Sequence, residues 1–372
     1  MTAGRLLQAT LAECATPDEA IAAETARRLD AKTKPRGSLG RLEELACRLG
    51  AIRGMVPEGP LIPAIVVAAA DHGVAARGVS AYPQEVTAQM LANFARGGAA
   101  ICALSRESGA RLVIVDVGVA DATPIMGVRV EVVDDVRVTA DLTQGPAMTR
   151  STAIGAIEHG IALAAELASD GVEIVGLGEM GIGNTTAASA LAAALLPCDA
   201  SVVCGPGTGL DEGGVARKLE AVRAGLRVNG LPDAGADPLT VLAAVGGLEI
   251  AFLVGLILGA TARRIVMLLD GFVTGGAALV AARLVPACVG SMIAATRSPE
   301  PGHVPVLKTL GLEPLLDLRL RLGEGTGSAL ALPLVRAAVA ILTDMATFES
   351  AGVDRRGTSR RDPQPIPATT DA

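Results

Sequence analysis

The sequence predicts an α/β fold with a doubly wound, mostly parallel sheet of about six strands. Six short apolar segments alternate with segments of helical composition, which is typical of a parallel sheet with helices on both faces. The first of them, residues 61–69, is apolar throughout, as expected for a strand covered on both sides. The 44 glycines stand between the periodic segments, where tight strand-to-helix turns need them.

The composition limits both the core and the class of function. Hydrophobic residues make up 50% of the 372 residues and aromatic residues only 1%, so Ala, Val, Leu and Ile must form the core. A net charge of −7 without a basic stripe argues against nucleic-acid binding. The six cysteines form no C-x-x-C pair and the three histidines lack ligand-like spacing, so we expect neither a disulfide framework nor a metal site. The N-terminus lacks a long apolar signal region, which favours a cytoplasmic protein.

Two helices are expected before the first strand, as an appendage to the sheet. Thr16, Pro17 and Glu19 occupy the N-cap, first and third positions of a capping box, and this helix should end near Arg28. Ser38 can cap the second helix, which has leucines at helical spacing, at positions 39, 42, 45 and 49.

The strand at residues 61–69 runs into Asp71 and His72. Polar groups at the carboxyl end of a parallel strand are where a site is expected in such a fold. A helix beginning at Pro83 follows, and residues 111–118 form the second strand.

Residues 129–139 alternate between charged and apolar, as a half-exposed hairpin does. The pair Asp134-Asp135 also resembles the acidic loop with which ordinary phosphoribosyltransferases hold a diphosphate sugar and magnesium. No glycine follows Thr139 to make a phosphate turn, and the neighbouring charges alternate in sign, so we favour the hairpin.

After a helix at residues 149–169, a strand, a glycine loop and a helix N-terminus occupy residues 172–190. Four glycines within residues 176–183 lead through Asn184-Thr185 into an alanine-rich helix. Such a junction offers free backbone N–H groups and the positive end of the helix dipole, so it suits an anion, usually a phosphate.

Gly176, Gly178 and Gly181 also match the G-x-G-x-x-G fingerprint of dinucleotide-binding proteins. That hypothesis predicts an acidic residue at the end of the next strand, which we place at residues 200–204. A second glycine-rich loop, residues 205–209, stands there instead. The fingerprint therefore fails where it can be checked.

The helix after this second loop carries Lys218. Two glycine loops and a lysine could together hold one phosphate and its ribose. A long apolar helix is then expected from Asp237-Pro238 to about Gly259. Glu249 within it, and the absence of a basic loop before it, favour a buried core helix over a membrane span.

Residues 264–272 form strand five, with Asp270 at its carboxyl end, and residues 287–295 form strand six. A closing helix is expected at residues 329–343. Residues 353–372, rich in arginine and proline, are expected to be a disordered tail.

Six motifs occur along the chain in a fixed order. They are Asp71-His-Gly-Val74, Gly178-Glu-Met-Gly-Ile-Gly-Asn-Thr-Thr186, Gly205-x-Gly-Thr-Gly209, Asp270-Gly271, Glu300-Pro-Gly-His303 and Leu322-Gly-Glu-Gly-Thr-Gly327. Together they closely resemble the nicotinate-nucleotide–dimethylbenzimidazole phosphoribosyltransferase family of cobalamin lower-ligand synthesis. The resemblance runs from about residue 34 to residue 353, and the loops around Glu179 and Glu324 are its most specific parts.

The resemblance implies transfer of phosphoribose from nicotinate mononucleotide to 5,6-dimethylbenzimidazole, a pentosyl transfer that needs no metal or other cofactor. It also implies a Rossmann-like sheet, residues 56–327, and a small helical domain built from both chain ends, residues 1–55 and 328–352. A homodimer is implied, with active sites near the subunit interface. Arg36 stands where the family pattern leads us to expect a small residue, in a loop that could reach the partner.

The resemblance also assigns roles to residues. Glu324 falls on the family's catalytic base. The benzimidazole side is implied at Ser80, Gln84 and Leu322. The phosphate, ribose and nicotinate side is implied at Glu179, Met180, Gly181, Gly183, Asn184, Thr185, Gly207, Thr208, Gly209, Lys218, Asp270, Gly271 and Ser298.

The chemistry of this transfer fits these residue types. A nicotinate nucleotide already carries a pyridinium, which leaves C1′ as a neutral ring, so no general acid is required. The attacking azole must lose its N–H proton, and one carboxylate in an apolar setting, such as Glu324, suffices as the base. Glu179 could stabilise the positive charge that develops on the sugar.

Two other classes of function compete with this one. An NAD-dependent oxidoreductase would bind NADH tightly, and a non-catalytic nucleotide-binding module would release no nicotinate.

Overall fold

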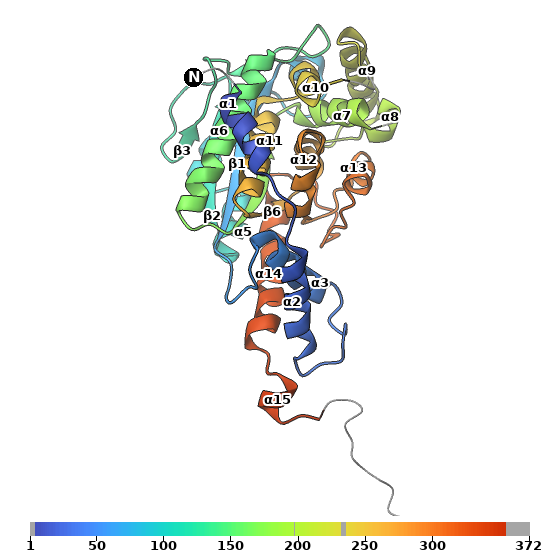
Figure 1. Ribbon diagram of the computed structural model, residues 1–372. Coiled ribbons are helices and arrows are strands. Elements are labelled where there is room, and N and C mark those ends of the chain that lie inside the picture. The colour runs from blue at the N-terminus through green and yellow to red at the C-terminus, as the bar shows by residue number, and fades with distance from the viewer. Residues whose placement is uncertain (1–3, 197, 232–235, 355–372) are drawn as a thin grey trace, which may run out of the picture.

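The computed structural model describes residues 4–196, 198–231 and 236–354, and a parallel sheet lies at its centre (Figure 1). Its strands are β1 (Pro63–His72), β2 (Arg111–Gly118), β3 (Val128–Val130), β4 (Val138–Thr139), β5 (Ile174–Met180), β6 (Val266–Leu269) and β7 (Met292–Ala294). The order is β3-β2-β1-β5-β6-β7, with β4 paired to the end of β1, and every pairing is parallel. The predicted doubly wound α/β sheet is confirmed.

Helices cover both faces of the sheet. One face packs against α11 (Leu248–Ala262) and α12 (Phe272–Leu284), with α6 (Arg150–Ser169) packed against α11. The other face packs against α3 (Arg41–Arg53), α4 (Val86–Ala95), α5 (Ala100–Glu107) and α14 (Thr326–Asp344). The side chains of β1 alternate between two hydrophobic cores, Val66 in one and Ile65 in the other. Coverage on both faces explains why this strand is apolar throughout.

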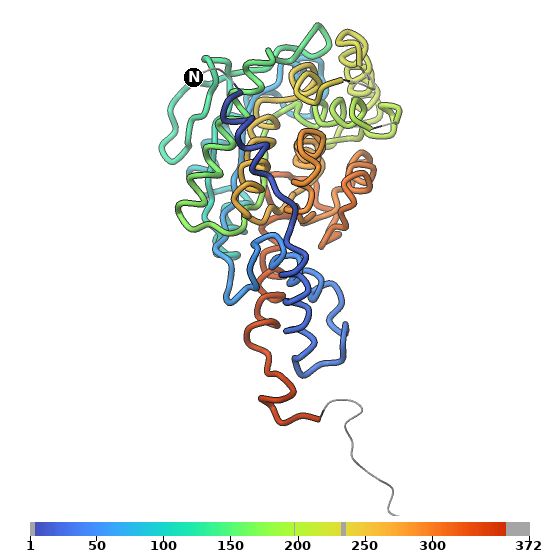
Figure 2. Tube along the Cα trace, in the orientation of Figure 1, coloured from blue at the N-terminus to red at the C-terminus, as the bar shows by residue number. Residues whose placement is uncertain are grey.

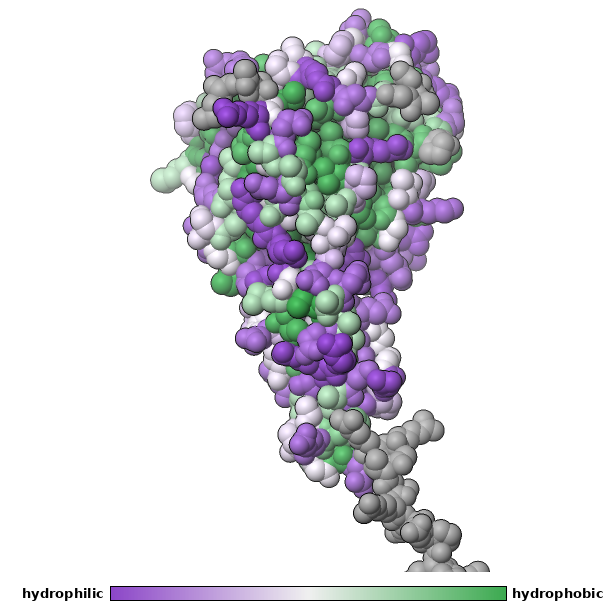
Figure 3. Space-filling model, viewed as in Figure 1, coloured by the Kyte–Doolittle hydropathy of each residue, from purple (hydrophilic) through white to green (hydrophobic). Residues whose placement is uncertain are grey.

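Both chain ends contribute to a helical lobe below the sheet. Here α2 (Glu19–Asp30) and α3 pack against α14, and α15 (Phe348–Ala351) follows (Figure 2). The first helix, α1 (Arg5–Glu13), lies instead against α6 and α11. The chain therefore begins beside the helices that cover the sheet and then continues into the lobe. Hydrophilic residues predominate on the visible surface of the lobe, whereas apolar residues gather near α11 and α12 (Figure 3). Most of the expected tail, residues 355–372, lies outside the described residues.

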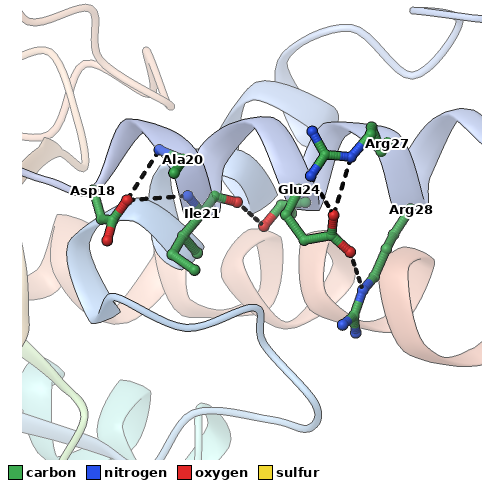
Figure 4. Close-up of polar contacts among 7 residues, drawn as sticks. Asp18, Ala20, Ile21, Glu24, Arg27 and Arg28 are labelled. Atoms are coloured by element: carbon green, nitrogen blue, oxygen red, sulfur yellow. Dashed lines mark hydrogen bonds and ion pairs between the residues drawn. The ribbon is translucent and has the colours of Figure 1, made fainter.

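The cap of α2 differs from the prediction. Asp18 is the N-cap, and its Oδ1 accepts hydrogen bonds from the backbone N–H groups of Ala20 (2.9 Å) and Ile21 (3.2 Å) (Figure 4). Thr16 and Glu19 therefore do not form a capping box. Asp and Thr are both good N-caps, and the backbone of Asp18 is anchored because its N–H donates to the Ala51 carbonyl (2.8 Å).

The start of α3 was also predicted too early. Its N-cap is Gly40, at φ 51°, and no side chain caps it, so Ser38 does not serve. The Glu43 carboxylate reaches back to accept from the backbone N–H of Leu39 (2.9 Å). This carboxylate therefore stabilises the turn that precedes the helix, and no side chain caps the first-turn N–H groups.

The predicted long apolar helix is two helices, α10 (Pro238–Val245) and α11. Asp237 caps the first helix as expected, and Gly246 and Gly247 interrupt the helical conformation between the two. A side chain at Gly247 would clash, because a Cβ there would lie 2.4 Å from the His72 ring. The residues of α11 are almost all buried in the core, Glu249 included.

Two further segments were predicted wrongly. Residues 200–204 form no strand but a short helix, α8 (Ala200–Val203), because Asp199 caps it through the backbone N–H of Ser201 (2.9 Å). Residues 129–139 are not a simple hairpin. Only Val133 and Val136 bridge in antiparallel fashion, while β3 and β4 join the sheet in parallel.

The strand predicted at residues 287–295 is only partly correct, because Pro286–Ser291 form a 3-10 helix and β7 begins at Met292. The strand at 111–118 and the helix at 149–169 are confirmed, and Thr149 is the N-cap of that helix. The remaining bounds are α7 (Asn184–Leu195), α9 (Glu212–Val228), α13 (His303–Leu310) and two 3-10 helices, Gly73–Arg77 and Pro286–Ser291. Among the described residues, α14 alone has the length and hydropathy to cross a membrane, and just over half of it is buried against the rest of the protein.

Candidate functional site

A pocket lies at the carboxyl ends of the strands, beside β5 and β6. The strand order reverses between β1 and β5, and the crevice outside such a switch point is where doubly wound sheets bind ligands. Loops after β5, β6 and β7 and the loop before α14 form its walls. The lining residues are Glu179, Met180, Gly181, Ile182, Asn184, Thr185, Gly207, Thr208, Asp270, Gly271, Phe272, Val273, Thr296, Ser298, Glu300, Leu320, Arg321, Leu322, Gly323 and Thr326.

The glycines of the fingerprint have a packing role. A Cβ at Gly178 would lie 2.6 Å from the backbone carbonyl of Glu324 and 2.7 Å from the backbone nitrogen of Gly325. A Cβ at Gly176 would lie 2.7 Å from the Ser328 side chain. These two glycines therefore let the start of α14 approach β5. The resemblance to a dinucleotide fingerprint is accidental.

A buried lysine, Lys218, supports the second glycine loop, residues 205–209. Lys218 is fully buried, and its Nζ donates to Thr185 Oγ1 (3.0 Å) and to the Gly205 carbonyl (3.1 Å). The Gly207 N–H donates to Glu300 Oε1 (2.8 Å). Burial lowers the pKa of Lys218, and the charge of Glu300 opposes that shift. Lys218 thus joins α7, α9 and the loop, but it lies outside the pocket lining.

Asp270 anchors the loop that carries Glu324. Its two carboxylate oxygens accept from the backbone N–H groups of Gly327 (2.7 Å) and Gly325 (3.1 Å), at the N-terminus of α14. Burial raises the pKa of Asp270 to about 7, while the helix N–H groups act in the opposite sense. The carboxyl end of β6 is therefore tied directly to the start of α14.

Glu324 lies in a strained and buried position between β5 and α14. Its φ of 60° is in the left-handed region, which a glutamate rarely adopts, and its N–H donates to the Glu179 carbonyl (3.2 Å). The side chain is 4% exposed, and Oε2 has no hydrogen-bond partner among the described residues. Burial raises the pKa of Glu324, and the backbone amide of Ile101, at the N-terminus of α5, opposes the shift.

Glu179 lines the pocket one strand away from Asp270. Its carboxylate accepts from the side-chain amide of Asn184, at the start of α7. Burial raises the pKa of Glu179 to about 8, and the neighbouring carboxylate of Asp270 adds to the shift. Two acids of one pocket therefore hold protons near neutral pH.

These shifts predict that stability falls between about pH 5 and pH 8. Glutamate and aspartate in an unfolded chain titrate near pH 4, whereas Glu179 titrates near 8 and Asp270 near 7 in the folded protein. Between these limits the folded state binds more protons, so the free energy of unfolding decreases as the pH rises. Urea denaturation at several pH values measures this decline. The Glu179→Gln variant should show a shallower one, and an unchanged slope would contradict the assignment.

The residues implied for the benzimidazole side lie in different places. Ser80 Oγ is 3.1 Å from Thr208 Oγ1, at the edge of the pocket, and Leu322 lines the pocket with more than half of its side chain exposed. Gln84 lines a second pocket of about 720 Å³ between α4 and the loop after β2, and the buried Asp71 is also part of that lining. Thr87 connects the two regions, because its Oγ1 accepts from the N–H of Ile182 (3.2 Å).

Eleven of the seventeen expected site residues line the first pocket. The six outside its lining are Gly183, Gly209, Lys218, Ser80, Gln84 and Glu324. Two pocket residues were not predicted as site residues: Glu300, the first residue of the motif at 300–303, and Arg321, which directly precedes the motif at 322–327. A signal existed for Glu300, an acid within a loop at the end of a strand. Arg321 is exposed, and only the fold places it opposite the glycine loops.

The pocket contains acids but no metal-binding cluster. Within the described part of the chain, no group of three or more His, Cys, Asp or Glu side chains is arranged to hold a metal ion. Its lining combines carboxylates, hydroxyls and loop backbone with a single cation, Arg321, among the described residues. The fold and this pocket define an α/β protein with a ligand pocket at the switch point of its sheet, lined by carboxylates, hydroxyls and loop backbone.

Comparisons with known proteins specify the class further. A family model described as "Phosphoribosyltransferase" matches residues 14–353. The nicotinate-nucleotide–dimethylbenzimidazole phosphoribosyltransferase of Chloroflexus aurantiacus is 50% identical over 354 residues, which cover 94% of this chain and 99% of the relative. The protein of that name from Halalkalibacterium halodurans is 52% identical over 328 residues, 87% of this chain and 90% of the relative. The crystal structure of CobT from Thermus thermophilus is 45% identical with a TM-score of 0.85, and the match covers 90% of this chain and 99% of that one. The chain belongs to the nicotinate-nucleotide–dimethylbenzimidazole phosphoribosyltransferase family.

Proposed function

We propose that the chain transfers phosphoribose from nicotinate mononucleotide to 5,6-dimethylbenzimidazole, which gives α-ribazole 5′-phosphate and nicotinate for cobalamin assembly. The observation that carries this proposal is the loop of residues 323–327, which places one buried glutamate beside the pocket at the carboxyl ends of β5 and β6. Relatives about 50% identical over nearly the whole chain carry the name of this activity.

The nucleotide occupies the pocket between the glycine loops in this proposal. Asn184, Thr185 and Ser298 offer side-chain hydrogen-bond groups there, and the N-terminus of α7 favours negative charge. Arg321 faces the same space from the opposite wall. Lys218 acts indirectly, since it holds Thr185 and the carbonyl of Gly205 rather than reaching the pocket itself.

The acids of the pocket suit the charge of the donor. Glu179 and Asp270 lie in the lining, and their raised pKa values mean that they lose protons when a cation approaches. A pyridinium and the oxocarbenium-like sugar that follows it are such cations. Carboxylates held in place before the reaction stabilise this positive charge without reorganisation.

Glu324 removes the azole proton. The azole attacks C1′ through its unprotonated nitrogen, the bond from C1′ to the nicotinate nitrogen breaks, and the N–H proton of the azole passes to the carboxylate. A buried carboxylate with a raised pKa and a free oxygen is a stronger base than an exposed one. Ser80, Leu322 and Gln84 are proposed to lie on the acceptor side.

The test is release of nicotinate. Purified protein with nicotinate mononucleotide and 5,6-dimethylbenzimidazole should produce nicotinate and α-ribazole 5′-phosphate, separated by chromatography. Protein that produces neither product contradicts the proposal and favours a binding module. Tight, saturable binding of NADH in a spectral titration would instead favour an oxidoreductase.

Arg321→Ala is expected to raise KM for nicotinate mononucleotide about 10- to 100-fold, because a charge-assisted hydrogen bond to phosphate contributes about 1.5–3 kcal/mol. KM for the benzimidazole should change little. Steady-state kinetics with each substrate varied in turn measures this. Arg319→Ala is the control, since Arg319 is exposed on the same segment but lies outside the pocket lining. Equal effects of the two substitutions would contradict a specific phosphate contact.

We also propose that the protein acts in the cytoplasm as a homodimer with its active sites near the subunit interface. Light scattering after gel filtration tests the oligomeric state, and a monomer at micromolar concentration would contradict it.

A further inference from the structure

A buried histidine–glutamate pair lies beneath the first glycine loop, and no step proposed above uses it. His72 is the last residue of β1 and Glu249 lies in the first turn of α11. His72 Nε2 and Glu249 Oε1 are 2.9 Å apart, with side chains 1% and 0% exposed. His72 Nδ1 and Glu249 Oε2 have no partner among the described residues. Desolvation of two ionisable side chains is costly, so loss of either partner would leave the other buried without its hydrogen bond.

The histidine ring is packed between two glycine segments. A Cβ at Gly181 would lie 3.3 Å from the ring, and a Cβ at Gly183 would lie 3.2 Å from His72 Cβ. On the other side, a Cβ at Gly247 would lie 2.4 Å from the ring and 2.6 Å from Glu249 Oε2. The break between α10 and α11 is what brings the glutamate this close. The ring therefore packs directly against residues 181–183 and supports their backbone.

The segment that packs against the His72 ring includes residues of the pocket. Gly181 and Ile182 line the pocket, and Asn184, which follows directly, begins α7 and donates to Glu179. A shift of the His72 ring would change the position of the Asn184 amide and of the α7 N-terminus relative to a bound nucleotide. Among the described residues, the side chains of His72 and Glu249 hydrogen-bond to each other and not to the acceptor-side residues Gln84 and Leu322.

We propose that His72 and Glu249 are positioning residues for the nicotinate nucleotide: their hydrogen bond sets the conformation of the loop of residues 181–184. The identity of the ligand rests on the proposed function. The pair acts through its hydrogen bond, so a glutamine at position 249, whose amide oxygen accepts the same bond from His72 Nε2–H, preserves the loop.

The test compares three variants with the unmodified protein. Glu249→Ala should raise both Kd and KM for nicotinate mononucleotide about tenfold, the order expected when a buried hydrogen-bond partner is removed. KM for 5,6-dimethylbenzimidazole should stay within about twofold, and Glu249→Gln should restore the nucleotide values. Leu256→Ala, in the buried middle of the same helix, should lower Tm without a change in either KM. Calorimetry gives Kd independently of turnover.

The outcomes separate a positioning role from a merely structural one. If Glu249→Ala lowers Tm but leaves the nucleotide Kd and KM unchanged, or moves both KM values alike, the inference is wrong while the proposed function stands. If Glu249→Ala does not fold, His72→Asn, which keeps a polar side chain but cannot reach Glu249, should give the same selective loss. Unmodified protein that neither binds nor converts nicotinate mononucleotide overturns the proposed function and the ligand assigned to this loop.

Discussion

Replacement of Glu324 by glutamine is expected to lower kcat about 100- to 10,000-fold, the range in which a positioned general base contributes. Glutamine has nearly the same shape and cannot accept the azole proton. Binding of nicotinate mononucleotide should persist, because the walls of its pocket do not include the Glu324 side chain. Single-turnover kinetics and calorimetry together measure the two effects.

The pH dependence provides a second measure of the same residue. Burial raises the pKa of Glu324, so the acid limb of kcat/KM should lie above the pH at which an ordinary glutamate titrates. Glu349→Gln, at an exposed site in α15, is the control and should leave the profile unchanged. A Glu324→Gln variant with activity within tenfold of the unmodified protein would exclude the glutamate as the base.

Gly178→Ala is expected to reduce kcat/KM about 100-fold, the order of loss that follows when reacting groups are misplaced by about 1 Å. The new methyl group would lie 2.6 Å from the backbone of Glu324, with no flexible side chain to give way. The loop before α14 must then move away from β5 and take Glu324 with it. Overpacking of this kind also costs about 1–3 kcal/mol of stability.

Gly59→Ala is the matched control for this substitution. Gly59 lies in a loop where a Cβ would meet nothing within 4 Å, so neither activity nor Tm should fall. Kinetics and thermal unfolding of both variants give the comparison. A Gly178→Ala protein with normal kcat/KM would mean that the approach of β5 to the Glu324 loop has no role in catalysis.

Much of the fold follows from local pattern. The continuous apolar run of β1 and the extent of α6 were both predicted, because burial on two faces and helical composition each leave a local signature. The errors lie where local signals are equivalent or tertiary contacts override them. Asp18 caps α2 in place of Thr16, and its backbone is anchored to Ala51 from a distant part of the chain. The break at Gly247 depends on the approach of His72 from another part of the chain.

By itself, the sequence determined the fold class, the family and the residue types gathered at the pocket, because motif order and hydrophobic periodicity are properties of the chain. Tertiary structure alone decided what each group touches. It placed Gly178 against the Glu324 backbone rather than a phosphate, buried Lys218 beneath its loop, and paired His72 with Glu249 across 177 positions. The physical reason is that close approach and burial arise between segments distant in the chain. No local pattern records the space that a neighbouring backbone will occupy.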